Sequence, residues 1–190
     1  MVFKGPVHYD ALLNVAMIAR GPGIDAGAVV DDPVGTIDLQ PTVLNAYGGF
    51  EISKTPSYSV HVGKLWLEKG GTWVVANIRG GGEYGPAWHQ AALKEKRQRA
   101  FDDFAAVASD LERRGITTAR QLGILGGSNG GLLVATAMTQ HPELFGAVVC
   151  QVPLIDMVRY PHIGAGASWM AEYGDPAIPD ALPISLDEPE

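Results

Sequence analysis

The stretch GGSNG at residues 126–130 is the feature that most constrains the fold of this chain. A serine between closely spaced glycines is typical of a tight turn from a strand into a helix, in which the serine takes a strained, exposed position. The neighbouring residues fit such a turn, because 122–125 is an apolar strand candidate and 129–140 an apolar helix candidate. We therefore predict a nucleophile elbow, with Ser128 as the nucleophile of a serine hydrolase.

Strand and helix patterns alternate along the chain from Thr42 onward. Strands are predicted at residues 42–47, 72–78, 122–125 and 145–152, and helices at 59–69, 87–97, 101–114 and 129–140. This alternation predicts the α/β class, a mostly parallel sheet with helices on both faces. The strand at 72–78 is almost entirely apolar, which predicts burial on both of its faces. Residues 1–40 follow no such pattern, apart from a short helix or strand candidate at 9–20.

Composition limits the classes of protein that this chain can represent. Its 190 residues, 46% of them hydrophobic, are enough for one packed core. The net charge of −7 excludes an electrostatic nucleic-acid binder, and no apolar run is long enough for a membrane span. The single cysteine, Cys150, lies in an apolar run, which predicts a buried and inert thiol. With no secretory signal at the start of the chain, we predict a cytoplasmic location.

A second glycine loop, GGGEYG at residues 80–85, offers a competing interpretation as a dinucleotide-binding loop. Glu83 would place a carboxylate where such a loop holds a pyrophosphate. The pair Asp102-Asp103 lies in a helix pattern, whereas a ribose-binding acid follows a second strand. Both features disfavour the nucleotide enzyme, which stays an alternative. We interpret Arg79 and the Asp102-Asp103 pair as structural, and predict no metal and no cofactor.

Four motifs together resemble the prolyl oligopeptidase family of serine peptidases. They are YGGF at 47–50, ANIRGGGEYG at 76–85 with the following Trp88-His89, FDDF at 101–104 and GGSNGG at 126–131. The resemblance runs from about Pro41 to Tyr173. It implies an α/β-hydrolase fold and a peptidase that cleaves short proline-containing peptides after proline, through an acyl-enzyme on Ser128.

The resemblance also implies roles for six further residues. An oxyanion hole would be formed by the backbone N–H of Asn129 and the hydroxyl of Tyr47, both of which donate a hydrogen bond to developing negative charge. A proline pocket would be formed by Phe50, Leu154, Trp169 and Tyr173. An aromatic floor suits the flat, apolar pyrrolidine ring. Ordinary packing in the sheet or core is the alternative for Tyr47 and the pocket residues.

The acid and the histidine of a catalytic triad would follow Ser128 in this fold. His141 and His162 are the histidines that follow it, and the later acids at 175–187 lie in a proline-rich tail. In the family both partners lie beyond the point where this chain stops. We therefore expect a C-terminally truncated catalytic domain at 41–180, inactive or nearly so by itself. It would lie between a poorly matched segment at 1–40 and a tail at 181–190 that leaves the family's pattern.

Two other functions stay open at this point. A non-catalytic module could keep the proline pocket and bind proline-containing peptides without a triad. An esterase could use the same fold and the same elbow, because neither of them defines the acyl substrate.

Overall fold

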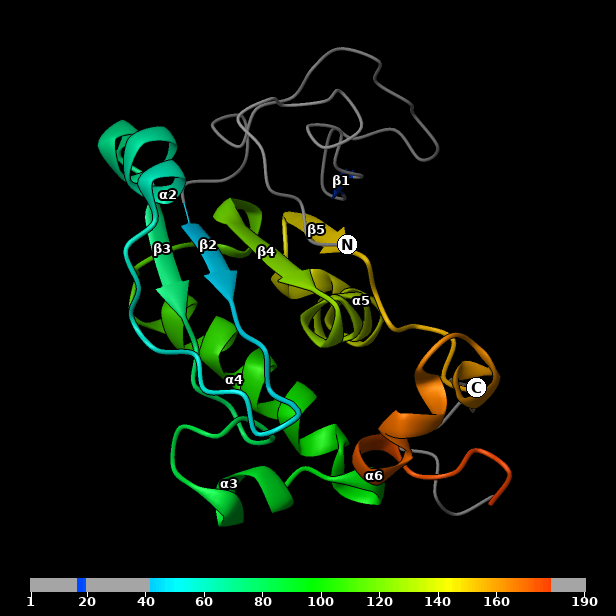
Figure 1. Cartoon of the computed structure of the whole chain (residues 1–190). Coiled ribbons are helices and arrows are strands. Elements are labelled where there is room, and N and C mark those ends of the chain that lie inside the picture. The colour runs from blue at the N-terminus through cyan, green and yellow to red at the C-terminus, as the bar shows by residue number, and fades with distance from the viewer. Residues whose placement is uncertain (1–16, 20–41, 179–190) are drawn as a thin grey trace, which may run out of the picture.

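The computed structural model describes residues 17–19 and 42–178, in which five strands form one sheet with the order β1-β5-β4-β2-β3. The strands are β1 (Met17–Ala19), β2 (Thr42–Asn45), β3 (Thr72–Val75), β4 (Leu122–Gly127) and β5 (Ala147–Gln151). Strands β2 to β5 are parallel, and β2, β3 and β4 lie side by side with their arrows in one direction (Figure 1). Strand β1 pairs antiparallel with β5. The predicted α/β sheet is confirmed. The antiparallel strand β1 falls within the segment 9–20, for which helix and strand were both open.

The helices α4 (Gln98–Arg113) and α5 (Asn129–Gln140) pack against each other and against the sheet. Helix α4 connects β3 to β4 and α5 connects β4 to β5, so both connections run across the sheet in the same direction. Because connections between parallel strands are right-handed, both helices lie on the same face of the sheet. Helix α4 buries Phe101, Phe104, Ala108 and Leu111, which recur every three or four residues. It ends before Gly115, whose φ of 69° favours glycine. Both predicted helices are confirmed, although α4 begins at Gln98.

The two other predicted helices are short and broken. The first is α2 (Val60–Leu65), followed by the 3-10 turn η2 (Leu67–Lys69). No residue of α2 is buried, and its crossover runs in the opposite direction, which places it on the other side of the sheet. The second is α3 (Pro86–Gln90), followed by η3 (Lys94–Lys96), where Lys94 has a φ of 51° that interrupts a helix. No helix within residues 42–178 is long and apolar enough to cross a membrane.

Strand β3 differs from its prediction in length and in burial. It ends at Val75, and the Val75 side chain is 39% exposed, so the predicted burial on both faces is wrong. Within the described sheet, β3 lies at the edge and pairs with β2 alone. Complete cover is a property of central strands in parallel sheets, and apolar composition does not tell a central strand from an edge strand.

The apolar core lies between the sheet and the pair α4 and α5, with Leu44, Ile124, Val148, Phe104 and Leu133 among its members. The arrowheads of β2, β3 and β4 point toward the end of the sheet where α3 and α6 (Met170–Tyr173) lie (Figure 1). Further 3-10 turns are η4 (Ala119–Gln121), η5 (Pro142–Leu144), η6 (Tyr160–His162) and η7 (Gly166–Trp169). Ligands of open parallel sheets bind beyond the carboxyl ends of the strands, so a functional site is expected at this end.

Candidate active site

Ser128 lies at the turn between β4 and α5, with φ 57° and ψ −119°. This conformation is strained for a residue with a side chain, and a nucleophile elbow requires it. Strand and helix approach closely, because a Cβ on Gly126 would lie 2.0 Å from the carbonyl oxygen of Gly130. The Ser128 N–H donates to the carbonyl oxygen of Gln151 at 3.0 Å, which ties the turn to β5. The elbow geometry is thus present, while the catalytic role of Ser128 stays a prediction.

The first N–H groups of α5 lie beside Ser128. The Gly131 N–H donates to the Ser128 carbonyl oxygen at 2.9 Å, whereas the Asn129 N–H has no backbone acceptor in residues 42–178. An unpaired N–H at a helix N-terminus favours a negatively charged group. The Tyr47 ring lies next to the same turn, since a Cβ on Gly130 would lie 3.7 Å from Tyr47 Cδ2. The Tyr47 ring and the Asn129 N–H therefore lie at the same turn, while their role as oxyanion donors stays a prediction.

The Asn129 side chain is fully buried and makes hydrogen bonds within the protein. Its Nδ2 donates to the Tyr47 carbonyl oxygen at 2.6 Å, and its Oδ1 accepts from the Tyr173 hydroxyl at 2.6 Å and from Arg97 Nη2. Burial raises the pKa of Tyr173 above its usual range, so the hydroxyl keeps the proton that it donates. The carboxamide holds the loop after β2, and the backbone N–H of the same residue has no acceptor within residues 42–178.

A buried ion pair that sequence reasoning missed lies behind this carboxamide. Arg97 is 1% exposed, and its Nη1 donates to Glu172 Oε1 at 2.8 Å. The Arg97 Cζ also lies 5.2 Å from the centre of the Tyr173 ring. Glu172 is 4% exposed, accepts from the Phe50 N–H at 2.8 Å, and lies with Oε2 2.8 Å from His89 Nε2. A charged network therefore connects α3, α4 and α6 to the predicted site.

Three of the four predicted pocket residues lie in one aromatic cluster. The Phe50 ring meets Tyr173 edge-on, with 5.6 Å between the ring centres. Trp169 stacks on Tyr160 at 6.4 Å, and Tyr160 meets Tyr173 at 5.7 Å, so Tyr160 is a member that sequence reasoning missed. Leu154 is half-buried against the same core. Tyr173 is fully buried, while Phe50 and Trp169 are half-buried and keep surface that a ligand can reach.

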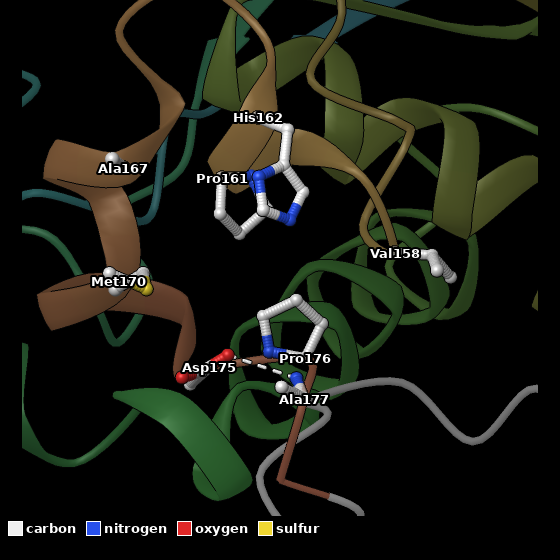
Figure 2. Close-up of a pocket in the computed structure, with 8 residues that line it drawn as sticks. All are labelled: Val158, Pro161, His162, Ala167, Met170, Asp175, Pro176 and Ala177. Atoms are coloured by element: carbon white, nitrogen blue, oxygen red, sulfur yellow. Dashed lines mark hydrogen bonds between the residues drawn. The ribbon is translucent and has the colours of Figure 1, made fainter.

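A separate pocket of about 550 Å³ lies between the turns η6 and η7 and the segment after α6 (Figure 2). Figure 2 shows its lining, which is Val158, Pro161, His162, Ala167, Met170, Asp175, Pro176 and Ala177. None of the predicted site residues contributes to it. The Asp175 carboxylate accepts from the Ala177 N–H at 2.9 Å and so stabilises its own turn. This pocket is therefore distinct from the predicted proline site.

The structure describes four histidines within residues 42–178, and the first of them, His61, lies in α2, which has no buried residue. His141 follows the C-terminal end of α5, whose 12 residues separate it from Ser128 by about 18 Å. His162 lines the pocket of Figure 2, and His89 lies on Glu172. Within residues 42–178, no histidine forms a hydrogen bond with Ser128, and no group of three or more His, Cys, Asp or Glu side chains is arranged to hold a metal ion.

The residues interpreted as structural are paired in the described chain. Arg79 donates from Nε and Nη2 to the two oxygens of Asp103, at 2.8 and 2.6 Å, which fixes the glycine loop to α4. Cys150, predicted to be buried, is half-buried, and its Sγ donates to the Gly131 carbonyl oxygen at 3.3 Å. Burial raises the pKa of the Cys150 thiol, so less of it is the reactive thiolate at neutral pH.

The glycine loop at 80–85 is filled by its own acid. Glu83 Oε1 accepts from the Lys54 N–H at 2.8 Å. A Cβ on Gly81 would lie 2.1 Å from Glu83 Oε2, so the carboxylate packs directly on the loop backbone. A dinucleotide loop leaves this space to a pyrophosphate, and the structure therefore argues against the nucleotide alternative.

Known proteins that resemble this chain are peptidases. Residues 56–181 match the prolyl oligopeptidase family. An uncharacterized peptidase of Sinorhizobium fredii is 61% identical over 139 residues, which cover 73% of this chain and 19% of the relative. A prolyl endopeptidase of Elizabethkingia miricola is 46% identical over 134 residues, which cover 70% of this chain and 19% of the relative.

Solved structures of the same group share the fold. One from a study of two prolyl endopeptidases is 51% identical, with a TM-score of 0.73 over 75% of this chain and 21% of that chain. A post-proline cleaving enzyme from Rickettsia typhi is 43% identical, with a TM-score of 0.73 over 98% of this chain and 29% of that chain. Prolyl oligopeptidase B from Galerina marginata, bound to a macrocyclization substrate, is 34% identical, with a TM-score of 0.72 over 75% and 20%.

This chain spans about a fifth of the length of the curated relatives that it matches. The family match nevertheless covers more than half of the chain and includes the elbow with Ser128. The chain belongs to the prolyl oligopeptidase family, and its described residues have the α/β-hydrolase fold of that family's catalytic domain.

Proposed function

We propose that residues 41–180 are part of the catalytic domain of a serine peptidase that cleaves peptides after proline. The observation that carries this proposal is the strained Ser128 at the elbow, with the unpaired N–H of Asn129 beside it. The prolyl endopeptidase of Elizabethkingia miricola and the post-proline cleaving enzyme of Rickettsia typhi support the proline preference, because both share at least 43% of the aligned residues with this chain.

In the proposed reaction, Ser128 Oγ attacks the carbonyl carbon of the proline residue, and its proton passes to a general base. The oxyanion that forms is stabilised by the Asn129 N–H and the Tyr47 hydroxyl. When the tetrahedral intermediate collapses, the peptide amine leaves with a proton, and the acyl-enzyme ester on Ser128 is then hydrolysed by water. Hydrolysis releases the peptide acid and returns the proton to the serine.

The general base is proposed to be a histidine, and none of the histidines described in residues 42–178 forms a hydrogen bond with Ser128. Support comes from prolyl oligopeptidase B of Galerina marginata, which was solved with substrates after a serine, an aspartate or a histidine had been replaced by alanine. Those three residue types form the triad of many serine hydrolases.

The proposed substrates are short proline-containing peptides. The half-buried rings of Phe50 and Trp169, which are linked through Tyr173 and Tyr160 in the aromatic cluster, offer flat apolar area to a pyrrolidine ring. Proline has no backbone N–H to leave unsatisfied in such a pocket. Leu154 is proposed to complete the wall of the pocket.

Covalent capture of a peptide aldehyde tests the nucleophile without requiring turnover. An N-blocked prolyl aldehyde labelled with carbon-13 at the aldehyde carbon is added to the 190-residue chain. We expect Ser128 Oγ to add to that carbon, with the hydroxyl proton ending on the former carbonyl oxygen. Carbon-13 NMR would show the resulting hemiacetal in the wild-type protein and its absence in Ser128→Ala.

The control variant for capture is Ser109→Ala. In the wild type, the Ser109 hydroxyl donates to the Ala105 carbonyl oxygen within α4, away from the elbow. This variant should form the hemiacetal like the wild type. Equal binding of the aldehyde by the wild type and Ser128→Ala, with no hemiacetal in either, would favour the non-catalytic proline-binding module. Capture of acyl analogues without proline as readily as of the prolyl compound would favour an esterase.

Turnover by this chain alone should be very low. No described histidine is bonded to Ser128, so deprotonation of the hydroxyl lacks a contribution of about 100-fold to 10,000-fold that a positioned base supplies. Release of a fluorescent group from an N-blocked Gly-Pro reporter peptide measures the rate. Robust turnover that disappears in Ser128→Ala would contradict this expectation and show that His141 or His162 reaches the serine in solution.

A further inference from the structure

We propose that the buried ion pair of Arg97 and Glu172 positions the oxyanion hole, an inference that rests on the proposed function of Ser128. The guanidinium binds two acceptors at once, with Nη1 on Glu172 Oε1 at 2.8 Å and Nη2 on Asn129 Oδ1. Arg97 and Glu172 are 1% and 4% exposed, so neither can touch a peptide. They are positioning residues that act through the groups they hold.

The first of these groups is the Asn129 carboxamide. Because Oδ1 accepts from Arg97 and from the Tyr173 hydroxyl, the amide can face in one direction only. Nδ2 then points at the Tyr47 carbonyl oxygen, to which it donates at 2.6 Å. Arg97 thereby fixes the Asn129 side chain, and through it the backbone of Tyr47. The Asn129 N–H and the Tyr47 hydroxyl are the two proposed donors of the oxyanion hole.

The second group is the backbone at Phe50, whose N–H donates to Glu172 Oε1 at 2.8 Å. Phe50 has a φ of 54°, a conformation that a residue with a side chain adopts only when its surroundings hold it. The loop 47–50 is thus held at its start through Asn129 and at its end by Glu172.

Gly49, in the middle of this loop, lies directly on the ion pair. A Cβ there would lie 2.6 Å from Asn129 Nδ2 and 2.7 Å from Arg97 Nη2. The loop therefore cannot settle closer to the guanidinium. Tyr47 at the start of the loop carries the proposed hydroxyl donor, so the ion pair sets the placement of that donor relative to Asn129.

The chemistry of the pair favours a geometric role. Apolar residues of similar volume often replace a buried ion pair without loss of stability, so stability alone does not account for such a pair. Arg97 Nε is buried and has no hydrogen-bond partner within residues 42–178. The guanidinium therefore leaves one donor unsatisfied while its two other nitrogens bind groups of the site.

The test compares two ligands on the full 190-residue chain, N-acetyl-Gly-Pro with a free carboxylate and the primary amide of the same dipeptide. The carboxylate carries the negative charge that an oxyanion hole favours, and the amide reports on the proline pocket. Titrations followed by the indole N–H signal of Trp169 give both dissociation constants. We expect the wild type to bind the acid more tightly than the amide. In Arg97→Met and in Glu172→Met, the dissociation constant of the acid should rise about tenfold, and that of the amide less than about twofold.

Glu172→Gln separates hydrogen bonding from charge. Glutamine keeps an oxygen for Arg97 Nη1 and the Phe50 N–H but carries no charge, so it removes the same negative charge as Glu172→Met. We expect Glu172→Gln to retain acid affinity within about threefold of the wild type, because a conserved acceptor preserves the geometry. If the carboxylate of Glu172 acted by repulsion at a distance, both variants would bind the acid more tightly.

Two further variants keep the test decisive. Arg79→Met removes the other arginine that forms a partly buried ion pair in the described chain, and it should leave the preference for the acid unchanged. If either single methionine variant fails to fold, the double variant Arg97→Met/Glu172→Met removes both charges together and should show the same loss of acid affinity.

Three results would overturn the inference. Wild-type acid affinity in Glu172→Met, or an equal loss for acid and amide in Arg97→Met, would show that the pair does not position the oxyanion hole. Binding of neither ligand by the wild-type chain would instead overturn the proposed function, and with it this inference. The wild-type titration therefore tests the function, and the comparison of variants tests the positioning role.

Discussion

Replacement of Glu172 by alanine is expected to lower the free energy of unfolding by about 3 to 5 kcal/mol. The Arg97 guanidinium is 1% exposed and would remain in the core without its counterion. The Phe50 N–H would lose its acceptor at the same time, at a residue whose φ of 54° already costs energy. Urea denaturation of the 190-residue chain, followed by circular dichroism, measures the change.

The matched control is Glu68→Ala. Glu68 also pairs with a cation, Lys64, at 2.9 Å, but the two side chains are 59% and 69% exposed, so the expected change is below about 1 kcal/mol. A Glu172→Ala variant within that same range would show that water reaches Arg97 in solution and replaces the lost carboxylate. Both variants remove one carboxylate from an ion pair. The difference between their losses of unfolding free energy therefore measures the effect of burying the pair.

The sequence could not identify this ion pair, although it identified the elbow. Ser128 is recognisable because the glycines around it, the strand before it and the helix after it are all local. Arg97 lies in the run KEKRQR at 94–99, and nothing in that run separates it from its exposed neighbours. Its burial depends on Asn129 and Glu172, which are 32 and 75 residues away along the chain. Such a contact becomes visible only when the sheet has brought these segments together.

The fold shows the same division between local and distant determinants. Helix α4 follows from the spacing of Phe101, Phe104 and Leu111, which is a local pattern. The exposure of Val75 follows from the place of β3 at the sheet edge, and strand order is a distant property. Hydrophobic periodicity could not predict helix α6, because its four residues form little more than one turn and are too few to repeat a pattern.

A second large loss of stability is expected for Gly126→Ala. The new Cβ would lie 2.0 Å from the carbonyl oxygen of Gly130 and 2.4 Å from its carbonyl carbon. Both are backbone atoms in the first turn of α5, so no change of side-chain rotamer relieves the clash. We expect a loss of about 3 kcal/mol in the free energy of unfolding, and loss of aldehyde capture because α5 must shift away from Ser128. Urea denaturation and the carbon-13 NMR experiment measure the two effects.

Gly63→Ala provides the comparison that separates sterics from flexibility. Gly63 lies in α2 with no heavy atom within 4 Å of an added Cβ, so alanine there should be neutral or stabilising by up to about 1 kcal/mol. Gly126 does not have a positive φ, so its backbone is one that alanine can adopt. A loss at Gly126 without a loss at Gly63 would therefore arise from the close approach of β4 and α5. That same close approach holds Ser128 in its strained conformation. Equal stability of the two variants would therefore show that the contact between Gly126 and Gly130 does not hold the elbow.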